Sequence, residues 1–179
     1  MGAATTELEQ ILAGDGAAAP PAFILEGLSD ELAHRRIEGA PRSIYEELWH
    51  IAFWQKVSID WIHGIETPYP EHASAGFPTE SDVAEEDWEA LKARFFHDNQ
   101  EAALAACDTE RLELPIGCPS RSGVPMRTMT VREQLENLGA TMRIISGELF
   151  SCGSSLKAGR LRREAIAGEA SAVPSPCGL

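Results

Sequence analysis

Apolar side chains recur every three or four residues in several stretches of the chain, which predicts α-helices. A short pattern over residues 5–12 predicts an N-terminal helix that stops at Gly14. A second pattern begins at Pro20 and Pro21, which suit the start of a helix, and continues to a break at Gly39. The apolar members of this second helix are Phe23, Ile24, Leu28 and Leu32.

The third stretch predicts the central helix of the fold, which begins after Ser43 and ends near His63. Ser43 and Glu46 have the spacing of a capping box. At about 100° per residue the helix carries two apolar stripes. The first consists of Ile44, Leu48, Ile51, Ile59 and Ile62, and the second of His50, Trp54, Val57 and Trp61. A helix that is apolar on two sides is buried between neighbouring elements.

Two more helices follow in the sequence. Ser81 is expected to cap a helix that runs through Trp88 to about Cys107, and Thr130, with Glu133 in the capping-box place, is expected to start the last one. The apolar stripe of the last helix is Val131, Leu135, Leu138, Met142, Ile145 and Leu149. In the loop over residues 108–129, a short extended piece with Leu112, Leu114 and Ile116 is expected to pair with Met126 and Met129.

These elements predict an all-α fold, an up-down-up-down four-helix bundle over residues 1–150 with a short extra N-terminal helix. Residues 151–179 are rich in Gly, Ser, Ala and Arg and have no sustained apolar period, which predicts a poorly ordered tail. The charge also changes near this point. Residues 1–140 carry 10 basic and 25 acidic side chains, whereas residues 141–179 carry 5 basic and 3 acidic ones.

The formal net charge of −13 predicts no nucleic-acid partner, because phosphate binding needs clustered lysine and arginine. No apolar run approaches the ~20 residues that span a bilayer, so no membrane partner is expected. The first residues, MGAATTELEQ, lack the apolar core of a secretory signal, which favours a cytoplasmic protein. The four cysteines have no metal-type spacing and are expected to be free thiols.

The segment SIYEELWHIAFWQKVSIDWIHG resembles the second bundle helix of the DinB-like superfamily. In that family a histidine followed by tryptophan four residues later supplies a metal ligand, and His50 and Trp54 occupy these places. LEGLSDELAHRRIEGAPRS and SGVPMRTMTVREQLENL also resemble family segments, so the resemblance covers roughly residues 5–140. It implies a DinB/YfiT-like bundle that is a divalent-metal-dependent thiol S-transferase or hydrolase. The expected cofactor is Ni, Zn or Mn, the substrate a thiol or other small molecule, and a homodimer is one possible assembly.

The resemblance also implies two further histidine ligands, four residues apart in the last helix, at the places of Thr141 and Ile145. Isoleucine has no donor atom, and threonine is at best a weak oxygen ligand. His50 is therefore the one metal-ligating residue that we predict, and the chain as written is expected to have lost the activity. From the residues alone, a histidine beside tryptophans is an ordinary packed core residue.

A shift of one base restores the missing residues. When the last base of each codon from Ala140 onward is joined to the first two of the next, synonymous codons allow the reading HNAYHLGRIVLLRQLLKGWPPPP. This string resembles the fourth helix and the proline-rich ending of the family, with histidines at positions 141 and 145. Loss of one base near the codons of Ala140 and Thr141, with the stop codon then missed, would explain the missing ligands and the change of charge. The shift can lie in the gene or in the determination of its sequence.

Two other classes of function stay open. One is a non-catalytic helical bundle that binds a hydrophobic small molecule or a protein partner through an aromatic cluster of Trp49, Trp54 and Trp61. The other is the product of a pseudogene, which has no function. The coding DNA around codons 138–145 is the observation that best separates these classes from a disrupted enzyme.

Overall fold

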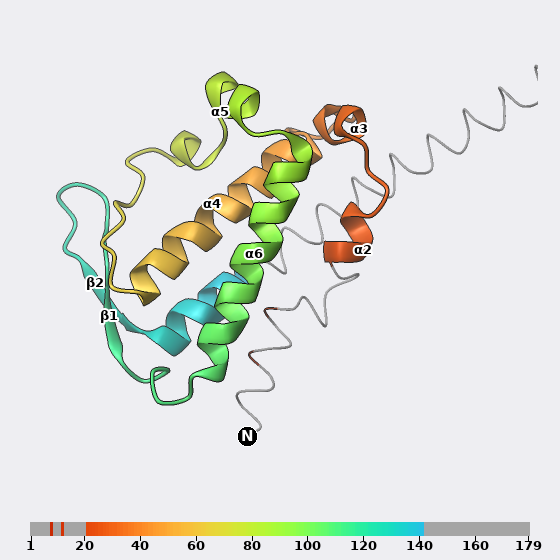
Figure 1. The fold of residues 1–179 in the computed structure, drawn as a ribbon. Helices are drawn as coiled ribbons and strands as arrows, with labels where there is room; N and C mark the ends of the chain where they lie inside the picture. The colour runs from red at the N-terminus through yellow and green to blue at the C-terminus, as the bar shows by residue number, and fades with distance from the viewer. Residues whose placement is uncertain (1–7, 9–11, 13–20, 142–179) are drawn as a thin grey trace, which may run out of the picture.

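The structure of the protein is a computed structural model, and it describes Leu8, Leu12 and residues 21–141. Two long helices, α4 (Ile44–Ile62) and α6 (Trp88–Cys107), pack side by side at its centre (Figure 1). The chain is mostly helical over the described residues, as the sequence predicts. The predicted tail over residues 151–179 and the domain limit at residue 150 lie outside the described residues.

Helix α4 begins and packs as its sequence predicts. The backbone N–H of Ser43 donates to the Glu46 carboxylate over 2.7 Å, and the Ser43 hydroxyl accepts from the N–H of Glu46 over 3.2 Å. Residues of the first stripe, such as Leu48 and Ile51, are buried in the main core with residues of α6. The second stripe faces a smaller core on the other side of α4. The helix is therefore buried on two sides.

Helices α4 and α6 run in the same direction. Near their first turns, the Tyr45 hydroxyl donates to the carbonyl of Glu86 over 2.6 Å, and near their last turns, Arg111 donates to the carbonyl of Ile62 over 3.0 Å. The connection over residues 63–87 returns along the length of α4 (Figure 1). It contains the 3-10 helix η1 (Ala73–Gly76) and helix α5 (Glu80–Glu85).

The predicted strictly alternating up-down-up-down order is therefore wrong for this pair of helices. A connection of this length can lead directly into an antiparallel helix, or it can run back along the first helix so that the next helix is parallel to it. Both kinds of connection occur in helix bundles. Apolar periodicity records which face of a helix is buried but not the direction in which the helix runs. The error follows from that missing information.

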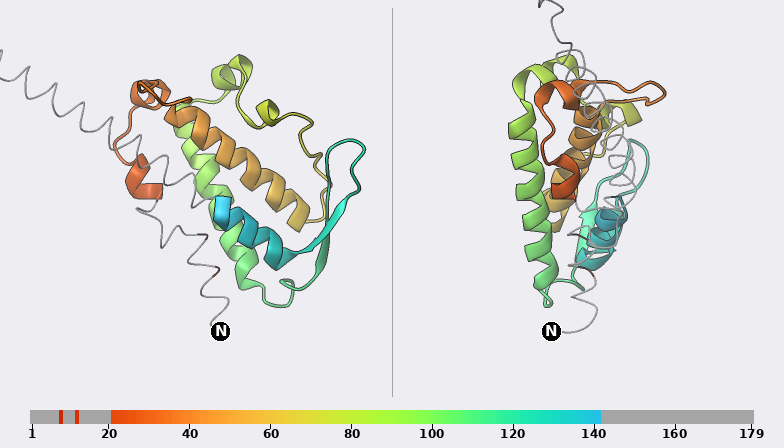
Figure 2. Two further views of the ribbon diagram at one scale, coloured as in Figure 1. Left: turned by 180° about the vertical axis from the view of Figure 1, so that it is seen from behind. Right: turned by 90° about the vertical axis from the view of Figure 1, so that its right-hand side faces the viewer.

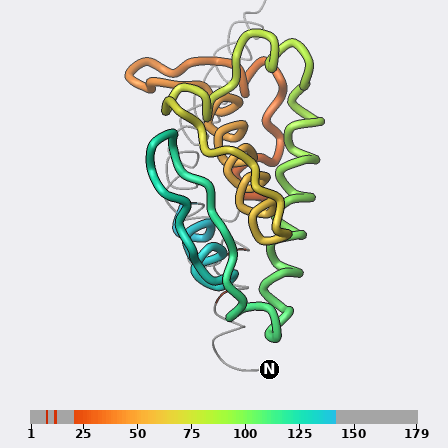
Figure 3. The backbone as a smooth tube through the Cα atoms, turned by 90° about the vertical axis from the view of Figure 1, so that its left-hand side faces the viewer, coloured from red at the N-terminus to blue at the C-terminus, as the bar shows by residue number. Residues whose placement is uncertain are grey.

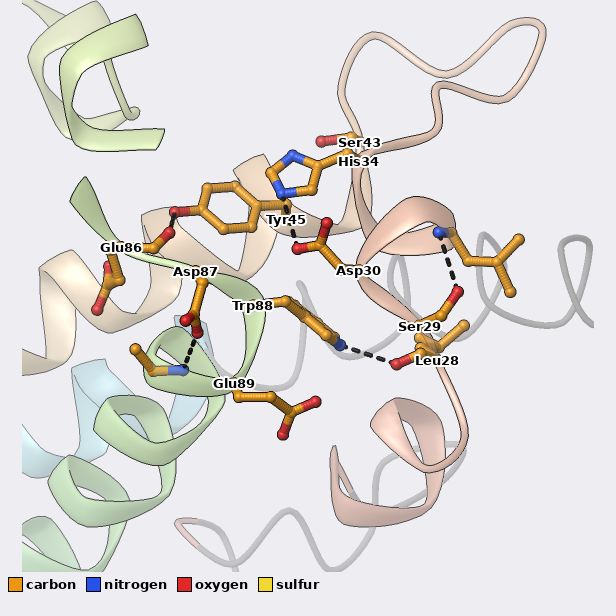
Figure 4. Close-up of polar contacts among 12 residues, drawn as sticks. Leu28, Ser29, Asp30, His34, Ser43, Tyr45, Glu86, Asp87, Trp88 and Glu89 are labelled. Atoms are coloured by element: carbon orange, nitrogen blue, oxygen red, sulfur yellow. Dashed lines mark hydrogen bonds and ion pairs between the residues drawn. The ribbon is translucent and has the colours of Figure 1, made fainter. Parts of the chain in front are cut away.

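The single predicted helix after Pro20 is two short helices, α2 (Pro21–Leu25) and α3 (Asp30–His34). Gly27 has a φ of 69°, a left-handed conformation that glycine adopts without steric cost and that ends α2. Ser29 then caps α3 by accepting from the N–H of Leu32. Figure 4 shows how the Trp88 indole N–H at the start of α6 donates to the Leu28 carbonyl, over 2.9 Å, and holds the α2–α3 connection.

Ser81 is not the cap of the helix that contains Trp88, so this prediction is also wrong. Thr79 caps the short helix α5, and Asp87 caps α6 by accepting from the N–H of Ala90 over 2.8 Å (Figure 4). The extended backbone at Glu86 separates the two helices. Each cap satisfies N–H groups that the start of a helix leaves unpaired. Because Asp87 provides such a cap directly before Trp88, a new helix begins there.

The predicted pairing of Ile116 with Met129 and the predicted start of the last helix are present in the structure, whereas Leu112 and Leu114 lie before β1 and Met126 lies before β2. Strands β1 (Pro115–Cys118) and β2 (Arg127–Thr130) are antiparallel, with Ile116 opposite Met129. Thr130 and Glu133 form a capping box, with contacts of 2.7 and 3.1 Å, and residues 131–141 are helical up to the last described residue. The predicted stripe residues Met142, Ile145 and Leu149 lie outside the described residues.

Helix α4 lies between α6 on one side and the hairpin with residues 131–141 on the other (Figure 3). Residues 131–141 run opposite to α4, as the view from behind shows (Figure 2). Leu8 and Leu12, the described part of the predicted N-terminal helix, are helical and buried in the main core. None of the helices in the described part of the chain is long and apolar enough to cross a bilayer.

Candidate functional site

The second stripe of α4 forms a small core with the hairpin. Val57 and Trp61 are buried there with Cys118 of β1. Around them lie half-buried apolar residues from α4, the crossover connection and the hairpin, which are Phe53, Trp54, Tyr69, Ile116 and Met129. His50 lies one helical turn before Trp54 on the same stripe, so this face of α4 carries both residues of the histidine–tryptophan spacing.

The imidazole of His50 is held by the crossover connection. Its Nδ1 lies 2.6 Å from the carbonyl oxygen of Gly76, and its ring stacks on Phe77 with centroids 4.0 Å apart and planes 3° from parallel. Because a carbonyl can only accept, Nδ1 carries the proton, and the lone pair of the neutral ring is on Nε2. A backbone carbonyl on the second ring nitrogen is typical of metal-binding histidines.

Gly76 allows this close contact. A Cβ at this position would lie 3.3 Å from Nδ1 of His50 and 3.5 Å from Nε1 of Trp54. The first distance is tighter than most Cβ contacts, so a larger residue would push against the His50 ring, whereas the second is an ordinary van der Waals contact. The glycine is therefore part of the setting of His50, although nothing in the sequence pattern connects the two positions.

The last helix approaches the same side of α4. The side-chain amide of Gln134 donates to the Ser58 hydroxyl over 2.9 Å. These two residues therefore lie at the same height along the two helices. At about 1.5 Å per residue, Thr141 lies about 10 Å further along its helix, and His50 lies about 12 Å along α4 from Ser58. The helices run in opposite directions, so both residues lie on the same side of the Gln134–Ser58 contact (Figure 2). Thr141 therefore reaches the level of the α4 turn that contains His50.

A pocket with a volume of about 240 Å³ separates the two helices. Its walls come from α4, the crossover connection, β2 and the last helix, and they are formed by Trp54, Ser58, Trp61, Tyr69, Arg127, Gln134, Asn137, Leu138 and Thr141. The Thr141 hydroxyl donates to the carbonyl of Asn137 over 3.0 Å, a bond within its own helix. Thr141 thus forms part of the pocket wall.

The residues present do not fit a divalent metal ion. Within the described ranges, no group of three His, Cys, Asp or Glu side chains lies close enough together to hold one. His50 is a suitable nitrogen ligand, but Thr141 offers only a hydroxyl that is already bonded to Asn137. Ile145 lies outside the described residues, and its side chain has no donor atom.

The predicted aromatic cluster divides in the structure. Trp54 and Trp61 line the pocket together with Tyr69, whose ring centroid is 5.2 Å from that of Trp54 and 6.4 Å from that of Trp61. Trp49 instead stacks on Phe53 and packs against the main core. Tyr69 lies in a proline-rich loop, where no periodic signal could place it.

Gln134 is absent from the site residues predicted from the sequence, although the sequence contains a signal for it. Gln134 lies three residues after Val131 and four before Leu138, so it falls on the apolar stripe of the last helix. It is 6% exposed, and a buried amide needs hydrogen-bond partners. A polar residue on an apolar stripe is therefore a reasonable indicator of a buried contact, here with Ser58.

Among the described residues of the pocket walls, Arg127 carries a positive charge and none is acidic, although the chain has 28 acidic and 15 basic side chains. Burial raises the pKa of the Cys118 thiol behind the pocket, and the positive charge of Arg127 acts against this rise. The guanidinium of Arg121 lies 5.8 Å from the ring centroid of Tyr69. Two cations of the hairpin therefore lie beside the aromatic wall.

A family model described as the DinB superfamily matches residues 22–139 of the chain. The match spans both long helices, the hairpin and His50, and it ends two residues before Thr141. No curated protein and no solved structure matches the chain.

Proposed function

Because the chain belongs to the DinB superfamily, we propose that its fold served a divalent-metal-dependent thiol S-transferase or hydrolase, and that the chain as written has lost this activity. In such an enzyme a bound Ni, Zn or Mn ion lowers the pKa of a thiol or a water molecule. His50 is the ligand that this chain retains, and the two ligands of the last helix are replaced.

The position of Thr141 carries this proposal. It lies in the wall of the pocket that Trp54 also lines, at the level of the α4 turn that contains His50. A histidine at position 141 would therefore face α4 across the pocket. Position 145 follows one helical turn later on the same face, so both imidazoles of the shifted reading could converge with His50.

The extent of the family match supports a shifted reading frame as the cause. The match ends at residue 139, and the shifted reading begins at the codon of Ala140. A substituted but continuous sequence would be expected to keep some similarity through the last helix. Sequencing of the coding DNA around codons 138–145 tests the cause directly, because an inserted base should restore HNAYH without any choice of synonymous codons.

A repaired protein tests the function. In it, residues 141–163 are replaced by HNAYHLGRIVLLRQLLKGWPPPP, and the chain ends there. One control has glutamine in place of both new histidines, and a second carries His50→Ala in the repaired chain. Melting temperatures are measured with a chelator and with nickel or zinc, and bound metal is quantified after dialysis.

The repaired chain and the glutamine control should both melt above the chain as written in the absence of metal, because their leucines can bury more apolar surface. Only the repaired chain with His50 should gain further from metal, by about 2.7 kcal/mol at a hundredfold excess over Kd. The chain as written should bind these ions no more tightly than micromolar. A repaired chain that gains no stability from metal, or gains as much with glutamines, would refute the proposal.

A non-catalytic binding protein is the second candidate function. It is favoured by the aromatic pocket, which exists without the two missing histidines because its described walls come from residues 54–141. Calorimetric titration of a ligand into metal-free protein separates this candidate from the enzyme, since only the enzyme needs the ion.

A further inference from the structure

We propose that the pocket between α4 and the last helix binds a small planar anion, an aromatic carboxylate, with its ring against Trp54 and Tyr69 and its carboxylate at Arg127. This inference goes beyond the proposed metal chemistry, because it needs neither an ion nor a histidine at positions 141 and 145. It rests on the size, the walls and the charge of the pocket.

The size of the pocket selects a small ligand. Sites for drug-sized molecules usually measure about 300–1,000 Å³, and this pocket has about 240 Å³. Trp54 and Tyr69 form its aromatic wall with Trp61, whose indole N–H donates to the carbonyl of Thr67 over 2.8 Å. That bond fixes the largely buried Trp61 ring behind the two half-buried rings and occupies its only donor. Aromatic faces of this kind favour a flat aromatic partner.

The charge of the pocket selects an anion. Among the described residues, Arg127 is the only charged member of the walls, and it forms no ion pair with any of them. A guanidinium presents parallel N–H groups that match the two oxygens of a carboxylate. In a chain of net charge −13, a wall whose described residues include a cation and no acid is an exception that would draw an anion in preference to a cation.

Two other polar side chains of the wall already donate hydrogen bonds within the protein. Gln134 donates to Ser58, and Thr141 donates to the carbonyl of Asn137. These bonds leave Arg127 as the strongest donor in the wall. A ligand whose charged group reaches Arg127 while its ring lies on Trp54 therefore contacts both the cationic and the aromatic part of the wall.

Three planar molecules of nearly equal shape test the proposal: benzoate, benzamide and benzamidine, which carry a negative charge, no charge and a positive charge. Each is titrated calorimetrically into the purified full chain in buffer with a chelator. Benzoate should bind about tenfold more tightly than benzamide, as expected when a hydrogen bond gains a charged acceptor, and benzamidine should bind most weakly. The metal-free conditions keep this result separate from the outcome for the repaired metal site.

Two arginine variants locate the binding. Arg127→Gln should reduce the affinity for benzoate about tenfold, to the level of benzamide, and leave benzamide unchanged. Arg36→Gln is the matched control, since Arg36 is an exposed arginine bonded to Glu46 at the other end of α4, and it should change neither ligand. Thermal melts of both variants confirm that they fold. Equal affinity for the three molecules, no effect of Arg127→Gln, or no saturable benzoate binding in the millimolar range would overturn the proposal.

Discussion

His50 is predicted to stabilise this protein without any metal, because it fastens the crossover connection to α4. Its Nδ1 donates to the carbonyl of Gly76 over 2.6 Å, and its ring stacks on Phe77 at 4.0 Å. The variant His50→Ala removes both contacts. It also leaves the carbonyl of Gly76, a buried residue, without this donor.

The expected loss follows from these contacts. Leaving a buried acceptor without its hydrogen bond costs about 1–3 kcal/mol, and the stacked ring pair contributes about 0.5–1.5 kcal/mol. Part of the cost is recovered when water reaches the half-buried site, so we expect a total of about 2–3 kcal/mol. For a chain of this length, 1 kcal/mol shifts the melting temperature by about 2–4 °C. His50→Ala should therefore melt about 5–10 °C lower.

Thermal melts in the presence of a chelator measure this effect. His50→Phe is the matched control, because it keeps a ring that can stack on Phe77 and loses the donor to Gly76. It should cost less than the alanine variant, about 1–2 kcal/mol. A loss below about 0.5 kcal/mol for His50→Ala, or a loss seen only when metal is present, would show that this histidine does not hold the connection.

Three further variants test the remaining contacts. Trp88→Phe removes the donor to the Leu28 carbonyl at a side chain that is 1% exposed, and it should lower the urea midpoint by the equivalent of about 1–2 kcal/mol; an unchanged midpoint would mean that the α2–α3 connection is held otherwise. Burial raises the pKa of Tyr45 to about 12, above its value of about 10 in the unfolded chain. Its contribution to stability is therefore complete below pH 10 and is lost as the pH rises toward 12, so Tyr45→Phe should show a shallower loss over that window in alkaline denaturation. Burial opposes ionisation of Asp60, but hydrogen bonds from Lys56 and Thr67 outweigh it and lower its pKa. Asp60→Asn should thus cost stability at neutral pH, and the difference from the unmodified chain should close as the pH falls through the lowered pKa; a constant difference down to pH 2 would contradict this.

The parts of the fold that the sequence predicts are those set by neighbouring residues. A capping box joins two side chains three residues apart, so Ser43 with Glu46 and Thr130 with Glu133 could be identified without any tertiary information. The two stripes of α4 are likewise a property of one helix. Burial on both sides follows from them, whatever the neighbours are.

The errors in the predicted fold concern places where two local signals compete, or where a long connection determines the direction of the next helix. Gly27 with Ser29 ends one helix and caps the next, yet the apolar spacing from Ile24 to Leu32 continues across the break. Asp87 does the same between α5 and α6. The parallel direction of α4 and α6 depends on the path of residues 63–87, a stretch with no periodic pattern.

For the candidate site, the sequence could identify His50 but not its partners. The resemblance depends on the spacing of His50 and Trp54 in one helix, whereas the contacts of His50 come from Gly76 and Phe77 in an irregular loop. The pocket joins side chains up to 87 positions apart, from Trp54 to Thr141. Trp54, Trp61 and Leu138 left a local signal as members of apolar stripes, and Gln134 left one as a polar residue on such a stripe.

The last helix is positioned by residues that precede the proposed shift of reading frame. Its start is fixed by the capping box at Thr130, its apolar face is buried at Val131, Leu135 and Leu138, and its level along α4 is set by the bond from Gln134 to Ser58. All these residues come before Ala140. The direction in which the helix presents position 141 is therefore determined before the proposed change of reading frame, because a helix continues with a fixed rotation per residue. A repair of the later residues changes the chemistry offered to His50 without needing a new docking of the helix, and this makes the repaired chain a test of the site rather than of the fold.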